Sequence, residues 1–179
     1  MKRRLFLAGL GALAPAAGCG YALQGRGITT DASVKRIGVP LFKDRTGKLG
    51  LDARVTAAVI TELLKRGRFA VVKETTGVDA VVEGELMAYT VQPVGFTGST
   101  TGTDVYTQAS RYAIALSASV VYRKVGQKEP LWSNDAFSQR DEYDMGEHAQ
   151  NYFDREEQSM ERLAEAFARS LVAAMLEAF

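Results

Sequence analysis

Within residues 111–125 a larger apolar or aromatic side chain or Ala118 stands at every second position from Tyr112 to Tyr122, and this stretch constrains the fold more than any other part of the sequence. Successive side chains of a β-strand point to opposite faces, so the alternation predicts a strand with one apolar face. That face would carry Tyr112, Ile114, Leu116, Ala118, Val120 and Tyr122. The turn-forming segment GQKEP (126–130) leads to a second strand over residues 131–140, so the two should form an antiparallel hairpin.

Two helices are predicted to cover the apolar face of such a sheet. The C-terminal one has a single apolar stripe of Met160, Leu163, Ala164, Phe167, Leu171 and Met175. Asp154 and Glu157 match a capping box at its start. Its charged face is interpreted as solvated, with a partner site as the alternative, and carries Glu161, Arg162, Glu165 and Arg169.

The first helix follows a predicted loop at residues 43–50, with Asp52 as its cap and its end at Gly67. Its apolar face would consist of Leu51, Val55, Val59 and Leu63.

Three further strands are predicted, over residues 34–42, 69–73 and 80–91. In the first of them Ile37, Val39 and Leu41 would point inward, and Pro40 indicates a sheet edge or a strand end. The predicted fold is therefore an α+β two-layer sandwich. Two helices pack on one face of a mostly antiparallel sheet of four to five strands, and the other face is partly bare.

Residues 92–109 are interpreted as a long loop between two strong strands, and loops of this length are usually functional. The segment holds Val94, Phe96, Val105 and Tyr106 among Gly, Ser and Thr, an apolar content that suggests contact with a partner. The alternative is a longer hairpin, in which residues 105–109 extend the next strand. A phosphate-binding loop is rejected, because the Gly-rich part at 95–104 has no Lys and no following helix.

The N-terminus has the build of a secretory signal peptide over residues 1–18, with Lys2, Arg3 and Arg4 ahead of an apolar segment. Small residues then lead into Cys19, an arrangement that resembles a lipobox and predicts acylation of that thiol. Residues 19–33 would be a lipidated tether and residues 34–179 a single domain. A plain signal peptide with an incidental Cys19 is the alternative. Gly20 in place of an aspartate favours the outer membrane.

The composition argues against several classes of function. The chain has 22 basic and 21 acidic residues, and removing the three leader cations leaves 19 against 21, a formal charge of −2. Nucleic-acid binding is therefore not expected. His148 is the only histidine, too little for a zinc site. The acidic residues at 140–147 lack EF-hand spacing and are interpreted as a solvated turn. No cofactor is expected.

In order along the chain, these segments resemble the LptE family of lipopolysaccharide-assembly lipoproteins. The resemblance rests on GCGYALQG, VKRIGVPLFKDRTGKLGLDARVTAAVITELLKRGRF, VDAVVEGELMAYTV, SRYAIALSASVVYR, LWSNDAFSQRDEYDM and NYFDREEQSMERLAEAFARSLVAAMLE. It implies a non-enzymatic outer-membrane lipoprotein that plugs the LptD β-barrel, helps it assemble and contacts lipopolysaccharide.

Within this resemblance, residues 92–109 hold no Lys or Arg, so Arg111 is the nearest candidate to bind lipopolysaccharide phosphates. Phe96, Val105 and Tyr106 are the candidate partner contacts. Two alternatives stay open: an outer-membrane lipoprotein of another envelope complex, either a peptidoglycan-synthase activator or a secretion-pore component, and a periplasmic hydrolase using a Ser, His148 and an acid.

Overall fold

The computed structural model describes residues 33–101, 104–145 and 152–177 of the chain. The elements in chain order are β1 (Arg36–Gly38), β2 (Lys43–Asp44), α1 (Leu51–Lys65), β3 (Ala70–Val72), β4 (Ala80–Thr101), β5 (Asp104–Lys124), β6 (Trp132–Asp144) and α2 (Tyr152–Glu177).

Among the described residues the strands form one mixed sheet of six strands, in the order β3-β1-β4-β5-β6, with β2 paired to β4. β1 runs parallel to β3 and β4, and β2 runs parallel to β4. The hairpins β4–β5 and β5–β6 are antiparallel. The α+β class is thus confirmed, whereas the strand number and the parallel pairs differ from the prediction, because a strand as short as β2 has no detectable period.

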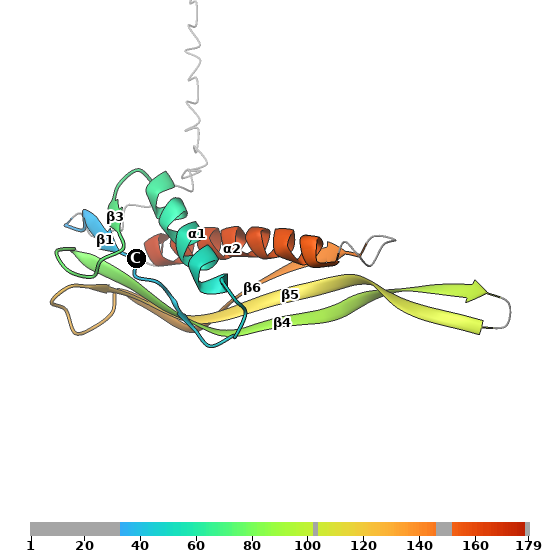
Figure 1. Cartoon of the computed structure of the whole chain (residues 1–179). Helices are drawn as coiled ribbons and strands as arrows, with labels where there is room; N and C mark the ends of the chain where they lie inside the picture. Colours follow the sequence, from blue (N-terminus) through green and yellow to red (C-terminus); the bar gives the residue numbers. More distant parts are fainter. Residues whose placement is uncertain (1–32, 102–103, 146–151, 178–179) are drawn as a thin grey trace, which may run out of the picture.

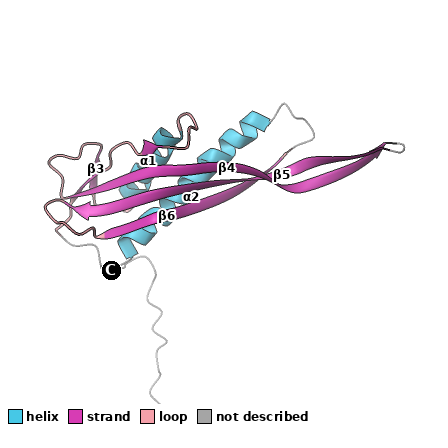
Figure 2. Cartoon of the chain, turned by 90° about the horizontal axis from the view of Figure 1, so that it is seen from below, coloured by secondary structure: helices cyan, strands magenta, loops and turns pink. Residues whose placement is uncertain are grey.

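Both helices lie on one face of the sheet, and no helix of the described residues covers the opposite face (Figures 1 and 2). The core lies between the two layers, and the predicted stripes of both helices are buried in it. Phe167 of α2 is fully buried and meets Phe137 of β6 edge to face, with ring centroids 5.1 Å apart. The alternation predicted for residues 111–125 is confirmed, since Ile114, Leu116 and Val120 are fully buried.

The strand predicted over residues 34–42 ends earlier than expected. β1 lies between β3 and β4, so Pro40 marks a strand end and not a sheet edge. Leu41 is 60% exposed, while Phe42 is buried. The inward prediction for Leu41 is therefore wrong, because β1 ends at Gly38, ahead of Pro40, and the period of two does not continue to Leu41.

Both predicted N-terminal caps are wrong. α1 begins after Gly50, whose φ of 76° is left-handed, and no side chain caps it; Asp52 lies inside the first turn. α2 is already helical from Tyr152, so Asp154 also lies within the first turn. Glu157 pairs instead with Arg54 of α1 and so links the two helices.

The loop predicted over residues 92–109 is also wrong, since β4 continues to Thr101 and β5 begins at Asp104. The longer hairpin, which was the alternative, is correct. Thr-rich sequence favours extended backbone, and the register continues to the last pair, Thr101 with Asp104. The Gly and Ser residues that suggested a loop are accommodated within the ladder.

Candidate partner-contact site

The outer part of the β4–β5 hairpin extends beyond both the third strand and the helix layer (Figures 1 and 2). Pairing between β5 and β6 ends at Arg111 with Asp144, whereas pairing between β4 and β5 continues for seven residues of β5 beyond that point. We call this outer part, residues 95–101 and 104–110, the ribbon. A two-stranded ribbon is only marginally stable in water unless something packs on it, so the ribbon is the first candidate for a contact surface.

The base of the ribbon is irregular. Register shifts occur between Pro93 and Gly95 and between Gly95 and Phe96. Pro93 has no N–H to donate to the ladder. Gly95 approaches β5 so closely that a Cβ there would lie 2.9 Å from Cβ of Arg111. These irregularities increase the local twist of a ladder, and the two strands cross at this part of the hairpin in Figure 2.

Arg111 stands at the base of the ribbon and is fixed by the last residue of β6. Its Nε donates to Oδ1 of Asp144 at 2.7 Å, and both side chains are about half exposed, at 52% and 65%. The hydrogen bond to Asp144, helped by its charge, raises the pKa of Arg111 above its ordinary value. Arg111 is therefore a permanent cation that a phosphate ligand would have to share with Asp144.

The structure places the predicted contact residues along the ribbon. Phe96 is 61% exposed and pairs with Ala109, next to the rung that holds Arg111. Val94, just below it, is 42% exposed. Val105 and Tyr106 pair with Thr100 and Ser99, closer to the turn. Arg111 and Phe96 are thus brought together, whereas the other two residues lie farther out, and the directions of their side chains fall outside the described part.

A buried polar contact that the sequence did not reveal supports the hairpin from the helix side. Glu156 of α2 accepts hydrogen bonds from Lys48 Nζ at 2.7 Å and from the Tyr89 hydroxyl at 3.1 Å. Its side chain is only 8% exposed. The contact ties the loop before α1 and strand β4 to α2. Neither Lys48 nor Glu156 stands in a pattern that marks it as buried.

The acidic segment predicted as a solvated turn is part of β6 as far as Asp144, so that prediction is wrong, and neighbouring side chains neutralise its acids. Asp141 accepts from Ser159 and Arg162, at 2.7 and 2.9 Å. Glu142 pairs with Arg140 at 2.9 Å. The described residues contain no group of three or more His, Cys, Asp or Glu side chains able to hold a metal ion. The acids of β6 from Asp141 to Asp144 are therefore engaged in ion pairs. Glu147, His148 and Cys19 lie outside the described residues.

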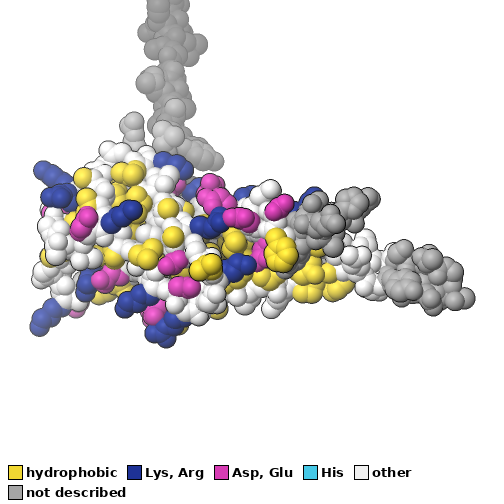
Figure 3. Space-filling model, in the orientation of Figure 1, with side chains coloured by type: hydrophobic (Ala, Val, Ile, Leu, Met, Phe, Trp, Pro, Cys, Tyr) yellow, Lys and Arg dark blue, Asp and Glu magenta, His cyan; other side chains and the backbone are white. Residues whose placement is uncertain are grey.

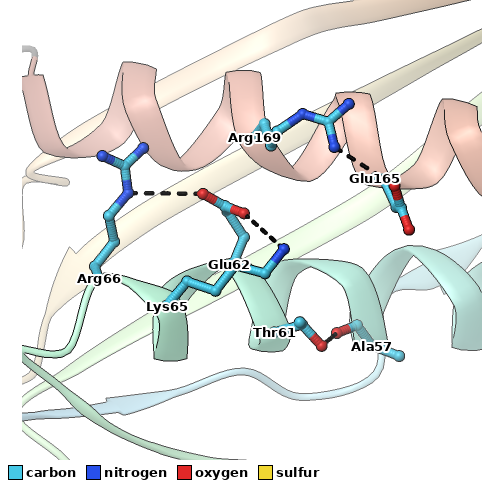
Figure 4. A network of polar contacts seen from close by, with 7 residues as sticks. All are labelled: Ala57, Thr61, Glu62, Lys65, Arg66, Glu165 and Arg169. Carbon is cyan, nitrogen blue, oxygen red and sulfur yellow. Dashed lines mark hydrogen bonds and ion pairs between the residues drawn. The ribbon is translucent and has the colours of Figure 1, made fainter.

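A groove of about 380 Å³ runs between the two helices. Small side chains such as Ala57 and Ala58 line it, and ion pairs border it. Figure 4 shows Glu62 between Lys65 and Arg66 on α1, and Arg169 with Glu165 on α2. Charges of both signs alternate along the rim, so the groove has no preference for a ligand of one charge. In the part of the chain with described structure, no helix is long and apolar enough to span a membrane.

The fold defines a class: a small α+β domain with two helices on one face of its sheet and a long exposed hairpin. The chain belongs to the LptE family, described as lipopolysaccharide-assembly, whose model matches residues 34–175. The family is one of non-enzymatic lipoproteins. No curated protein matches the sequence.

Several solved structures are similar in outline. A putative lipoprotein from Caulobacter crescentus has 10% identity and a TM-score of 0.48, over 75% of this chain and 87% of that one. The hypothetical protein CT253 from Chlamydia trachomatis has 10% identity and a TM-score of 0.48, over 82% and 100%. Protein XCC0632 from Xanthomonas campestris has 10% identity and a TM-score of 0.47, over 80% and 84%. At these TM-scores the likenesses carry no argument about this chain.

Proposed function

We propose that this chain is an outer-membrane lipoprotein, anchored through acylated Cys19, that occupies the lumen of the LptD β-barrel. There it helps the barrel to assemble and assists delivery of lipopolysaccharide to the outer leaflet. The match of the LptE family model to residues 34–175 is the observation that carries this proposal. In this proposal the chain acts by binding its partners, as the family assignment favours.

The face of the sheet without helices supports a place inside a barrel. On β5 the side chains on this face are small: Ala113 is buried, while Ala115, Ser117 and Ser119 are partly exposed. They alternate with the core-facing residues Ile114, Leu116, Ala118 and Val120, which are fully buried. The residues paired with Ala113 and Ala115 include Thr90, Gln92, Arg140 and Glu142. Large membrane barrels have polar interiors that can hold a plug, and a sheet face of small and polar side chains is compatible with such walls.

The ribbon would be the part that reaches deepest into the lumen. Phe96 and Val94 offer exposed apolar surface to the barrel wall or to acyl chains. Arg111 offers a charge to lipopolysaccharide phosphates, although Asp144 competes for it. Covering the ribbon on both sides would also supply the packing that an isolated two-stranded hairpin lacks.

The test is affinity purification of the lipidated protein from detergent-solubilised outer membranes, followed by identification of what co-purifies. LptD is expected in amounts comparable to the bait. Photo-crosslinking from Phe96 should capture LptD or lipopolysaccharide, whereas the same crosslinker at Glu161, on the solvated face of α2, should capture less. Absence of LptD from the purified material, or equal capture from both positions, would contradict the proposal.

A second measurement addresses the anchor. Mass spectrometry of the membrane fraction should find a lipid-modified Cys19 as the first residue of the mature chain. A Cys19→Ser variant should leave the membrane fraction and keep its fold, because Cys19 precedes the domain. Cleavage at another position, or an unmodified thiol, would contradict the lipid anchor at Cys19. The contact with LptD would then be tested by the purification alone.

A further inference from the structure

We propose that the end of the domain at which the chain enters from Ser33 is a docking surface for anionic phospholipid headgroups. We call this surface the basic end; its members are Lys35, Arg36, Arg68, Lys124, Val125 and Lys128. The inference rests on the anchor at Cys19 proposed above, because an acylated tether that joins the domain at this end holds it close to a leaflet.

Backbone hydrogen bonds bring the members of the basic end together from three strands. The N–H of Ala70 donates to the carbonyl of Lys35 at 2.8 Å, so the start of β3, with Arg68 just ahead of it, lies beside the start of β1. The N–H of Asp79 donates to the carbonyl of Arg36 at 3.0 Å, which adds the start of β4.

The end of β5 and the turn after it lie at the same place. The N–H of Val125 donates to the carbonyl of Asp79 at 2.8 Å, and Lys128 follows within the turn to β6. Lys124 Nζ donates to Oγ of Ser33 at 2.7 Å, so the point where the tether joins the domain lies on this surface.

Four cations of the basic end form no ion pair among the described residues, as is also true of Lys43 and Lys73, whereas most described arginines elsewhere on the domain are paired. The side chains of Lys35, Arg36, Arg68 and Lys128 are exposed and, among the described residues, form no ion pair. Elsewhere a set of arginines is engaged with carboxylates: Arg45, Arg54, Arg111, Arg123, Arg140, Arg162 and Arg169. The basic end therefore has cations available for an external anion.

One carboxylate at this end, that of Asp79, is already engaged by the backbone. Asp79 accepts the backbone N–H groups of Lys35 and Arg36, both at 2.8 Å. Glu83 lines a hollow together with Lys124 and Val125 and is paired with Arg123, and Glu129 follows Lys128 in the turn. The basic end is thus positive on a chain whose sequence from Cys19 onward carries a formal charge of −2. Figure 3 shows Lys and Arg side chains at the end of the molecule away from the hairpin.

An anionic phospholipid surface suits this combination. A Lys or Arg held within about 8 Å of anionic headgroups, the Debye length in physiological salt, strengthens binding roughly fivefold. Val125 is 54% exposed between Lys124 and Lys128 and offers an apolar contact at the headgroup level. The ribbon lies at the opposite end of the molecule (Figure 1), so headgroups bound at the basic end would not cover it.

Vesicle sedimentation of the chain from residue 19, carrying Cys19→Ser so that no acyl chain contributes, tests the surface itself. Vesicles of equal parts phosphatidylglycerol and phosphatidylcholine should bind it, vesicles of phosphatidylcholine alone should not, and added salt should weaken the binding. The combined variant Lys35→Gln, Arg36→Gln, Arg68→Gln, Lys128→Gln should bind at least about tenfold more weakly. The matched control Arg45→Gln, Arg140→Gln, Arg162→Gln, Arg169→Gln removes the same charge elsewhere and should bind like the parent.

A second measurement uses the acylated protein in the same two kinds of vesicle. Amine-reactive labelling should be slower at Lys35 and Lys128 in phosphatidylglycerol vesicles than in phosphatidylcholine ones, while labelling at Lys43 should not change. Equal sedimentation of the two charge variants, or unchanged labelling at Lys35 and Lys128, would overturn the inference. Neither result depends on co-purification with LptD, so a failure here is distinguishable from a failure of the proposed function.

Discussion

Lys48 Nζ lies 2.7 Å from Oε1 of Glu156, and this ion pair joins the loop before α1 to the first turns of α2. The carboxylate is almost completely buried, while Lys48 remains one-third exposed. Lys48 Nζ also lies 5.5 Å from the centre of the Tyr89 ring, and the hydroxyl of that ring donates to the same carboxylate. The helix layer is thus fastened to β4 just below the base of the ribbon.

Removing the cation should leave a buried carboxylate with one hydrogen bond. Lys48→Met is expected to lower the free energy of unfolding by about 1–3 kcal/mol, the range for leaving a buried polar group short of a partner. Lys48→Met combined with Glu156→Gln should recover part of the loss, because no uncompensated charge remains. Urea denaturation of the three variants measures this. A double variant less stable than Lys48→Met would show that the pair is not the source of the effect.

Gly84 of β4 lies against the ring of Phe42, and a Cβ there would be 2.3 Å from the nearest ring carbon. Gly84→Ala should therefore displace a buried ring and cost about 1–3 kcal/mol, as overpacking does. Gly98→Ala is the matched control, because a Cβ at Gly98 meets nothing within 4 Å. Thermal melts should separate the two variants. If Gly98→Ala is equally destabilised, the cost comes from the change of residue type and not from contact with Phe42.

The sequence was informative where a period was long and uninterrupted. The apolar spacing of the C-terminal helix, over roughly four turns from Met160 to Met175, and the alternation through Ile114 and Leu116 predict the elements whose side chains the structure buries most completely. The alternation gave the wrong direction for Leu41, because β1 ends at Gly38. It also did not reveal β2, which has two residues. Parallel pairing of β1 with β3 and β4 depends on contacts far apart in the chain, so no local pattern predicts it.

The residues of the candidate site could be predicted from the sequence, but its structure, a paired hairpin in place of a loop, could not. Phe96 and Arg111 stand out in the sequence as apolar and charged residues at a break in the pattern. Glycines were interpreted as loop formers, yet Gly95 is needed because β5 passes too close for a side chain. The partner of Arg111 is Asp144, 33 residues away. Such a pairing follows only from the register of β5 with β6.

The central aromatic contact of the core gives the third prediction. Phe167 is fully buried against Phe137, so Phe167→Ala should cost about 3–5 kcal/mol. That loss is a large share of the stability of an ordinary domain, and the midpoint of urea unfolding should fall accordingly. Leu49→Ala, at a side chain that is 96% exposed, is the control and should leave the midpoint unchanged. A small effect at Phe167 would mean that the helix does not pack on the sheet as described.

Asp79 should give the domain a specific acid sensitivity. Hydrogen bonds from the backbone N–H groups of Lys35 and Arg36 hold the pKa of its carboxyl below the ordinary value of 3.8. The contribution of this group to stability is therefore present above the ordinary pKa and is lost as pH falls through the lower pKa of the folded state. Asp79→Asn should be less stable than the parent at neutral pH and should lose less stability on acidification.

Urea unfolding at pH values between about 6 and about 2 compares the loss of stability on acidification in Asp79→Asn and in the parent. This range covers the pKa of the carboxyl in both the folded and the unfolded state. Asp135→Asn removes the same charge from an exposed position of β6 and should keep the parental slope. If Asp79→Asn and the parent lose the same amount of stability on acidification, the hydrogen bonds of the Asp79 carboxylate do not stabilise the contact between the starts of β1 and β4.

Competition between Asp144 and an external phosphate for Arg111 gives the last prediction. If Arg111 binds lipopolysaccharide, Arg111→Gln should weaken the binding, whereas Asp144→Asn should strengthen it, because the guanidinium is then released from its 2.7 Å partner. Both groups are about half exposed, so each effect should be no more than about fivefold, the range of exposed ion pairs. Arg140→Gln and Glu142→Gln are the matched controls, because each breaks another exposed ion pair on β6. If purified lipopolysaccharide binds with the same changes in affinity in both pairs of variants, the effect comes from net charge alone. If none of the four variants changes the affinity, Arg111 is not part of the binding site.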